Sequence, residues 1–450
     1  MQKPSTSKGT RDFGPEKVRK RTYIFDTIRS VFVKFGFQPL ETPAVENLST
    51  LTGKYGDEGD NLLFKIRSNK NLIEKLSPEL VEQIRKEYDF GFIPMASELG
   101  LRYDLTVPFA RYVVMNRDKL IFPFKRYQIQ PVWRGENPQR GRYREFFQCD
   151  ADVIGSDSLL YEAELTQIYD EAFAKLGVPV VIKINNRKVL FGIAEVAGIP
   201  DKFADMTVAI DKLDKIGIEG VRKELAERDI SADSISTIEK ILAASDFESL
   251  SPIFASSETG QKGLDELARV FRLLGKTSLQ NEMKFDITLA RGLTYYTGCI
   301  FEVSAKNYQM GSIGGGGRYA DLTGVFGVPG LSGVGISFGA DRIYDVMEGL
   351  NLFPETLAES VKIMLASFDE PTFEYAFQCA TELRKAGVAA ELYPEPGKLK
   401  KQFEYVAKRN IPYVAIVGET EMQTKTLMVK NQKTGEQEAM TVEQVVTLLT

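Results

Sequence analysis

Hydrophobic residues along the chain follow two periods, one typical of helices and one typical of strands. Apolar side chains recur at near-helical spacing through Glu16–Phe35, so this segment is predicted to be an amphipathic helix. Phe37–Glu46 is interrupted by prolines and is expected to be extended. Phe122–Arg134 and Tyr143–Asp152 alternate with period two and predict two strands that flank the loop Gly135–Arg142.

Helical patterns return in the middle of the chain. Residues 186–275 carry short helical patterns between charged turns, which predicts an inserted helical module. Strand character resumes at Met283–Leu289 and Thr297–Val303, ahead of a glycine-dense segment, Gly311–Gly339.

Strands and helices alternate in the last part of the chain, beyond a predicted linker at residues 351–360. This order is typical of a small α/β domain with a largely parallel sheet. The expected elements are Val361–Phe368, a helix through Lys385, Val388–Tyr393, the helix Leu399–Arg409, Tyr413–Gly418 and Thr426–Lys430. At 450 residues, the chain is long enough for two or three domains.

Composition narrows the environment in which the chain works. No run of 18 apolar residues and no signal-peptide core occurs, so we expect no membrane segment. Cys149, Cys299 and Cys379 lie far apart, which favours the reducing cytoplasm over a disulfide framework or a cysteine-ligated zinc. With a net charge of −5, any contact with nucleic acid must come from local basic patches.

The chain contains no histidine, whereas average usage would give roughly ten in a chain this long. This count excludes Ser-His-Asp triads, histidine-ligated zinc and histidine general bases. Chemistry must therefore rest on carboxylates, arginines, tyrosines and backbone groups.

The two predicted strands around Gly135–Arg142 share a polar face. It comprises Gln128, Gln130 and Arg134 on the first strand and Arg144, Phe146, Gln148, Asp150 and Asp152 on the second. A polar face of an antiparallel sheet is often simply solvated. Fixed arginines beside an aromatic ring, with Arg140 and Arg142 in the loop, are equally typical of an anion or nucleotide site.

Glycine-rich segments offer a weaker signal. The sequence has neither a P-loop motif nor a strand-led dinucleotide motif, so any ATP site belongs to another fold. Gly314–Gly317 precedes Arg318-Tyr319 and follows RGLTYYTG at Arg291–Gly298. Such a run forms either a flexible turn or a stretch of backbone without side chains that a ligand can approach closely.

Three segments carry a resemblance to class II aminoacyl-tRNA synthetases. WRGE at Trp133–Glu136 with PQRGRYREF at Pro138–Phe146 resembles motif 2, and GVGISFGADRI at Gly333–Ile343 resembles motif 3. The first helix and the extended segment through Pro43 are similar to motif 1, which forms the dimer interface in that class.

Other segments are similar to the histidyl branch of that class. They are LRYDLTVPFARY (Leu101–Tyr112), QCDADVIG (Gln148–Gly155), ARGLTYYTG (Ala290–Gly298) and GGGRYADL (Gly315–Leu322). KLKKQFEYVAKRNIPYVAIVGE at Lys398–Glu419 resembles the branch's anticodon-binding domain. One departure is Thr294, which stands where the family has an acidic residue.

The resemblance implies an α/β fold in several parts. It places an α+β catalytic domain on a mainly antiparallel sheet at residues 1–350, with the helical insertion at about 186–275, and an anticodon-binding domain at 361–450. It also implies a homodimeric enzyme that activates L-histidine with ATP, accompanied by Mg²⁺, and esterifies it to tRNA(His). No side chain is assigned as a metal ligand.

Roles for the ATP site follow from the same resemblance. Arg134 is expected to bind the α-phosphate and the histidine carboxylate, and Arg291 to stabilise the transition state. Arg142 and Arg342 are expected to bind the outer phosphates. Glu136 is expected to contact the adenine amino group, and Phe146 to stack on the adenine ring.

Roles for the amino acid site follow in the same way. Around the ammonium group the resemblance implies Asp104, Thr106 and Gln148; at the imidazole it implies Asp152 and Tyr296, with Tyr295 and Tyr319 as the wall. Ordinary core packing is the alternative for Tyr295 and Tyr296. Strand parity also puts Arg291 and Tyr296 on opposite faces unless Gly292 forms a bulge.

A basic helix near the end of the chain is the candidate tRNA contact. It and its approach carry Lys398, Lys400, Lys401, Lys408 and Arg409 against one acidic residue, Glu404. Such a face is commonly only solvated, but beside synthetase motifs it predicts contacts with tRNA phosphates.

Two other functions compete with the histidine enzyme. The synthetase-like regulatory subunit of ATP phosphoribosyltransferase typically lacks the anticodon domain and has an eroded ARGLxYYTG segment. A threonine or proline synthetase is expected to lack QCDAD and RGLTYYTG. The absence of histidine suggests an enzyme that can still be translated when charged tRNA(His) is scarce, with drift as the alternative.

Overall fold

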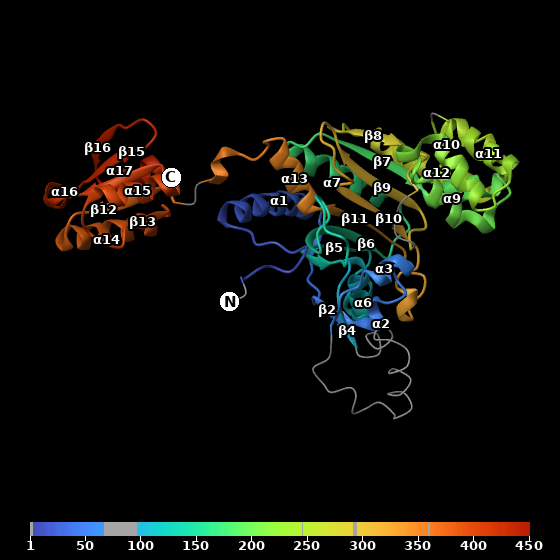
Figure 1. Ribbon diagram of the computed structural model, residues 1–450, viewed down its shortest axis with the longest axis horizontal. Helices are drawn as coiled ribbons and strands as arrows, with labels where there is room; N and C mark the ends of the chain where they lie inside the picture. Colours follow the sequence, from blue (N-terminus) through green and yellow to red (C-terminus); the bar gives the residue numbers. More distant parts are fainter. Residues whose placement is uncertain (1–2, 67–96, 245, 291–294, 359–360) are drawn as a thin grey trace, which may run out of the picture. The chain divides into compact units, whose positions relative to one another are not determined.

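The computed structural model describes residues 3–66, 97–244, 246–290, 295–358 and 361–450 (Figure 1). The chain divides into two compact units, Met1–Phe353 and Pro354–Thr450. No helix in the described ranges is both long and apolar enough to cross a membrane.

An eight-stranded sheet organises the first unit, in the order β1-β5-β6-β11-β10-β9-β7-β8. β1 pairs with β5 and β8 with β7 in parallel, while the other described pairings in this sheet are antiparallel. The predicted mainly antiparallel sheet is therefore confirmed. The strands are β1 (Gln38–Pro39), β5 (Phe124–Trp133), β6 (Glu145–Ile154), β7 (Val180–Asn186), β8 (Glu282–Phe285), β9 (Cys299–Ala305), β10 (Gly314–Tyr319) and β11 (Gly333–Gly339).

Three helices cover one face of this sheet: α1 (Pro15–Lys34), α7 (Leu160–Lys175) and α13 (Ala340–Gly349). The apolar stripe that predicted α1 is its core face, because Ile24, Ile28 and Phe32 are fully buried. Phe32 packs against Tyr127 of β5 and Phe338 of β11. The main hydrophobic core of the unit lies between these helices and the sheet.

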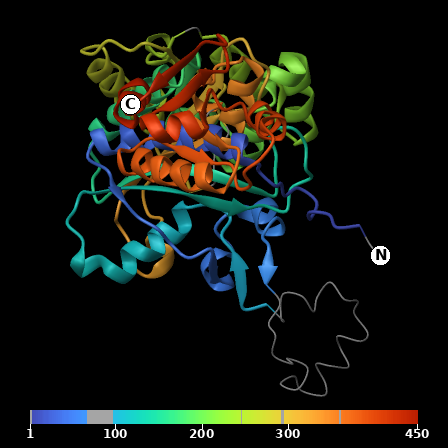
Figure 2. The same cartoon turned by 90° about the vertical axis from the view of Figure 1, so that its left-hand side faces the viewer.

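Smaller elements cover the opposite face, including α2 (Leu48–Leu51), α3 (Gly56–Asn61) and α6 (Thr106–Asn116). A three-stranded sheet joins them, in the order β2 (Val45–Asn47), β4 (Leu99–Leu101) and β3 (Lys65–Ile66). The 90° view also shows α6, in teal, on the far side of the strands from α1 (Figure 2).

A group of helices lies between β7 and β8 in the sequence, over the region where an insertion was predicted. Its members are α8 (Arg187–Val196), α9 (Phe203–Ile210), α10 (Leu213–Glu227), α11 (Ala232–Leu242) and α12 (Glu258–Leu274). α8 begins directly after β7, because the Asn186 side chain caps it by accepting a hydrogen bond from the Lys188 amide.

The predicted strand Met283–Leu289 is too long at its C-terminal end. β8 stops at Phe285, and the Asp286 carboxylate then accepts hydrogen bonds from the Thr288 amide and hydroxyl. This local turn competes with continued strand pairing, as short acidic side chains often do.

The second unit is a five-stranded sheet in the order β13-β12-β14-β15-β16. Its strands are β12 (Ile363–Ser367), β13 (Ala390–Leu392), β14 (Tyr413–Val417), β15 (Leu427–Asn431) and β16 (Gln437–Met440), and its helices are α14 (Glu370–Lys385), α15 (Leu399–Arg409), α16 (Glu419–Thr424) and α17 (Val442–Leu449).

The largely parallel sheet predicted for this unit is wrong for its last strands. β12 pairs in parallel with β13 and β14, but β15 is antiparallel to both β14 and β16. The connection that contains α16 is shorter than the dozen or so residues that a parallel crossover needs. The chain therefore turns back after β14.

Candidate active site

The candidate site lies on the polar face of β5 and β6. Arg126, Gln128 and Gln130 of β5 pair across the strands with residues 152, 150 and 148 of β6, respectively. The alternate residues of both strands, including Tyr127, Cys149 and Ala151, belong to the core beneath the helices. The predicted face is therefore the one opposite α1 and α7.

Asp152 is held by two partners. Its Oδ2 lies 2.7 Å from Arg126 Nη2, and its Oδ1 accepts a hydrogen bond of 2.9 Å from the Tyr319 hydroxyl. All three side chains are buried. Burial raises the pKa of Asp152, and the Arg126 charge opposes that rise.

Gly335 of β11 makes room for this carboxylate. It pairs with Asp152, and a Cβ at Gly335 would lie 2.0 Å from Asp152 Oδ1. Only glycine lets the strand pass this close, which gives one glycine of the motif 3-like segment a physical role.

Asp104 forms a second buried acceptor, just before α6. It accepts hydrogen bonds from the Val107 amide at 3.0 Å, the Tyr55 hydroxyl at 3.1 Å and the Tyr295 hydroxyl at 3.4 Å. Burial raises the pKa of Asp104, while the hydrogen bond from Val107 and the charge of Arg134 lower it. A buried carboxylate with a nearby arginine suits the ammonium end of an amino acid.

The predicted tyrosines gather beside these carboxylates. The rings of Tyr295 and Tyr296 meet edge to face with centroids 5.0 Å apart, and Tyr295 lies 6.2 Å from Tyr319. A hydrogen bond joins the side chains of Tyr295 and Thr106. The structure thus brings together Asp104, Thr106 and the three tyrosines, and Tyr319 connects them with Asp152.

Acceptors without protein partners lie on the same two strands, β5 and β6. Among the described residues, Gln128 Oε1, Gln148 Oε1 and Asp150 Oδ1 are buried and accept no hydrogen bond. Gln148 Nε2 donates to Ser337 Oγ at 3.1 Å. Burial raises the pKa of Asp150 to about 7. These acceptors suit a ligand rich in N–H groups, because buried polar atoms are normally paired.

The residues assigned to the nucleotide meet around the β5–β6 loop (residues 134–144). The Arg134 guanidinium lies over the rings of Tyr103 and Phe146, at 4.3 and 5.2 Å. Arg142 Nε is 3.8 Å from Glu136 Oε2. Arg342, at the start of α13, donates from Nε to the Gly141 carbonyl at 2.7 Å and so reaches the same loop.

Two residues of the sequence prediction are outside the described ranges: Arg291, predicted to act on the transition state, and Thr294. The predicted parity conflict between Arg291 and Tyr296 falls there too, and it stays a prediction.

Sequence reasoning missed two residues that support the site. Arg126 is the buried partner of Asp152, and Tyr55 is a donor to Asp104. The period-two pattern that selected Gln128 also selects Arg126, so Arg126 could have been found. Tyr55 comes from a different segment, and no local pattern connects it with Asp104.

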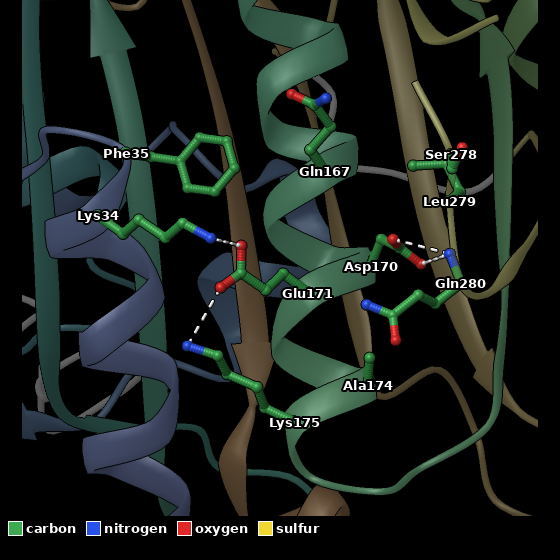
Figure 3. A pocket seen from close by; sticks show the side chains of 10 residues that line it. All are labelled: Lys34, Phe35, Gln167, Asp170, Glu171, Ala174, Lys175, Ser278, Leu279 and Gln280. Atoms are coloured by element: carbon green, nitrogen blue, oxygen red, sulfur yellow. Dashed lines mark hydrogen bonds and ion pairs between the residues drawn. The ribbon is translucent and has the colours of Figure 1, made fainter. Parts of the chain in front are cut away.

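A surface pocket on the helical side of the sheet involves none of the candidate residues. Figure 3 shows it between α1, α7 and residues 278–280. Its charges pair with one another, because Lys34 and Lys175 lie 2.8 and 3.1 Å from the Glu171 carboxylate. Asp170 accepts from the Gln280 amide at 3.0 Å.

Comparison with known proteins identifies the family. A family profile described as histidyl-tRNA synthetase matches residues 92–343. A histidine–tRNA ligase from Bacteroides fragilis is 52% identical to this chain, and the alignment covers 100% of the chain and 99% of the relative. The chain belongs to the histidyl-tRNA synthetase family.

Solved structures of that family share the fold. A histidyl-tRNA synthetase from a Nostoc species matches with a TM-score of 0.82 and 29% identity, covering 100% of this chain and 99% of its own. An ATP phosphoribosyltransferase regulatory subunit/histidyl-tRNA synthetase from Bacillus halodurans gives 0.71 at 19% identity, over 90% and 97% of the chains. The latter likeness shows the fold alone.

Residues 360–450 match a second profile, described as an anticodon binding domain. The predicted tRNA contacts of this histidyl-tRNA synthetase family member lie on α15 and at its N-terminus. Lys401 is 3.1 Å from Glu395 and Arg409 is 3.5 Å from Glu391, so these two cations are already paired. Lys400 and Lys408 are exposed on the same helix.

Proposed function

We propose that the chain is a histidine–tRNA ligase whose amino acid pocket is built around Asp104 and Asp152. The observation that carries this proposal is the set of buried carboxylates and partnerless acceptors on β5 and β6, in a chain similar over its full length to histidine–tRNA ligases. An imidazole and an ammonium group together supply N–H donors for these acceptors.

Two transfers make up the proposed reaction. A carboxylate oxygen of histidine attacks the α-phosphorus of ATP, and pyrophosphate leaves with the electrons of the broken P–O bond. A hydroxyl of the tRNA 3′ end then attacks the carbonyl carbon of the adenylate and gives up its proton, and AMP leaves with the electrons of the broken C–O bond. Both steps depend on positioning and on positive charge near the developing negative charge.

Arg134 is the described residue best placed to act in the first transfer. Its guanidinium lies over the rings of Tyr103 and Phe146 and its Nε donates to the Tyr103 carbonyl at 3.2 Å, so its direction is restrained before substrates bind. We propose that it contacts the histidine carboxylate and the α-phosphate, that Phe146 stacks on adenine and Glu136 reads its amino group, and that Arg142 and Arg342 bind the outer phosphates. Arg291 keeps the transition-state role that the resemblance implies.

The histidine side chain is recognised by fixed polar groups in this proposal. Asp152 accepts an imidazole N–H while Arg126 and Tyr319 hold its orientation. Tyr296 pairs with the other imidazole nitrogen, and Asp104, Thr106 and Gln148 surround the ammonium group. An amino acid whose side chain has no N–H group would leave these buried atoms unpaired. Its binding is therefore strongly disfavoured.

Mg²⁺ accompanies ATP in this proposal. No group of three or more His, Cys, Asp or Glu side chains in the described ranges could hold a metal ion. We therefore propose that the nucleotide phosphates are the main ligands of Mg²⁺, as is usual for this ion at such sites.

The proposal extends to domains and partners. Residues 1–350 form the catalytic domain with the insertion at about 186–275, residues 351–360 the linker, and residues 361–450 the anticodon-binding domain that contacts tRNA(His). We propose that the enzyme works as a homodimer in the cytoplasm. Three buried cysteines with free thiols, Cys149, Cys299 and Cys379, support a reducing compartment.

Pyrophosphate exchange into ATP, measured with each of the twenty amino acids in turn, tests the proposal. We expect exchange with histidine and at most traces with the others. Exchange that follows threonine or proline instead would assign another synthetase. No exchange with any amino acid, from a folded protein that also fails to charge tRNA(His), would favour the regulatory-subunit alternative.

A further inference from the structure

The segment before α1 lies directly on the β5–β6 loop. The Gly9 carbonyl accepts a hydrogen bond of 2.9 Å from the Arg144 amide. Gly9 has a φ of +85°, and a Cβ there would lie 2.7 Å from Arg144 Cγ and 2.8 Å from Pro138 Cγ. A side chain at position 9 would therefore collide with the loop, and glycine lets the segment lie against it.

Arg11 of the same segment bridges the loop and α13. Its guanidinium carbon is 3.2 Å from the centroid of the Tyr143 ring, and its Nη2 is 2.6 Å from Asp341 Oδ1 in the first turn of α13. Tyr143 also reaches α13, because its hydroxyl donates to Asp345 at 2.8 Å. Arg11 thus lies where the loop meets the helix.

Loop and helix each carry a proposed phosphate-binding arginine, Arg142 on the loop and Arg342 on α13. Their separation must match the outer phosphates of ATP, since a displacement of even about 1 Å weakens such contacts considerably. Resting on the proposed function, we infer that Arg11 is a positioning residue for ATP. Stacked on Tyr143 and paired with Asp341, it fixes the β5–β6 loop against α13.

Substitution of Arg11 does not leave the buried Asp341 carboxylate without a partner. Arg21 of α1 also pairs with Asp341 Oδ1, and the Phe147 amide donates to Oδ2 at 2.9 Å. A variant that lacks Arg11 therefore keeps two partners for this carboxylate and is expected to fold.

The chain offers a closely matched control in Lys20. This residue of α1 also pairs with a carboxylate of α13, Glu348 at 3.0 Å, and lies 5.3 Å from an aromatic ring, that of Phe353. Neither partner belongs to the β5–β6 loop. Lys20→Ala therefore removes the same kinds of interaction without touching the loop.

The test measures histidine-dependent pyrophosphate exchange in the full-length protein. We expect Arg11→Ala to raise KM for ATP roughly 3- to 30-fold, with KM for histidine within about twofold of wild type. Lys20→Ala should leave both values unchanged. Arg11→Lys keeps the charge for Asp341 but loses the planar stack on Tyr143, so KM for ATP should rise here too.

Each result decides the inference. An ATP KM for both Arg11 variants within about twofold of wild type overturns it, and so does an equal rise in both substrate KM values. If Arg11→Ala does not fold, Arg11→Lys alone decides by the same criterion. Wild-type protein that exchanges with no amino acid refutes the proposed function instead, so the two failures are distinguishable.

Discussion

The Arg126 guanidinium lies 2.7 Å from the Asp152 carboxylate, and both side chains are almost completely buried. Arg126 holds the Asp152 carboxylate in one place and favours its ionised form. Tyr319 occupies one lone pair of that carboxylate, which leaves room for a further donor. The pair is therefore suited to receive an imidazole N–H without rearrangement.

Asp152→Asn should raise KM for histidine much more than KM for ATP. Asparagine keeps the shape of the side chain but loses the charge that an imidazole N–H would meet. A poorly paired donor in a closed site costs roughly 1–3 kcal/mol, or about 5- to 150-fold. Steady-state pyrophosphate exchange at varied histidine and at varied ATP measures the two constants.

Asp170→Asn is a suitable control for this measurement. Asp170 is also a buried aspartate of the same unit, but it accepts hydrogen bonds from the Gln280 and Asn281 amides on the helical side of the sheet. Its substitution should change stability and leave the ratio of the two KM values unaltered. A rise in KM for ATP alone in Asp152→Asn would assign Asp152 to the nucleotide instead.

The sequence predicted the strands of the site well, because period-two alternation depends on neighbouring residues only. It therefore selected Gln148 and Asp152 on the correct face. It could not predict the Asp104–Tyr55 contact or the Arg11–Asp341 ion pair, which joins residues 330 positions apart. Such contacts depend on the path of the whole chain and have no local pattern.

The prediction of a largely parallel sheet in the second unit was wrong for a related reason. Alternating strand and helix patterns indicate parallel crossovers only if each connection is long enough. The predicted interval between Tyr413–Gly418 and Thr426–Lys430 was already short, and the sheet reverses there. The short connection was the feature of the sequence that could have predicted the antiparallel strand.

A chain that ends at Phe353 should keep histidine-dependent pyrophosphate exchange and lose most tRNA charging. The described candidate residues for ATP and histidine all lie in the unit Met1–Phe353, whereas α15 with Lys400 and Lys408 lies in the other. Both activities are measured on the same preparation. An equal loss of exchange and charging would show that the second unit supports the catalytic site.

Light scattering should give a mass about twice the 50.4 kDa of one chain. The segments that resemble motif 1 expose apolar side chains: Val33 of α1 is 57% and Val45 of β2 is 41% exposed. A second copy that covered them would remove this surface from water. A monomer at the concentrations used for activity measurements would contradict the proposed homodimer.

Asp150 should make the stability of the protein depend on pH in a predictable direction. Its pKa is raised from 3.8 to about 7, mainly by burial. Between these values the native state binds a proton that the unfolded chain does not. The contribution of Asp150 to stability is therefore fully present below about pH 4 and is lost as pH rises through 7.

Asp150→Asn removes this titration, so the variant should gain stability relative to wild type as pH rises. From pH 5 to pH 8 the difference in unfolding free energy should shift by roughly 2–3 kcal/mol in favour of the variant. Thermal unfolding of both proteins at several pH values measures it, as a growing difference in Tm. A difference that stays constant over this range would show that Asp150 ionises like an exposed carboxylate and that burial does not raise its pKa.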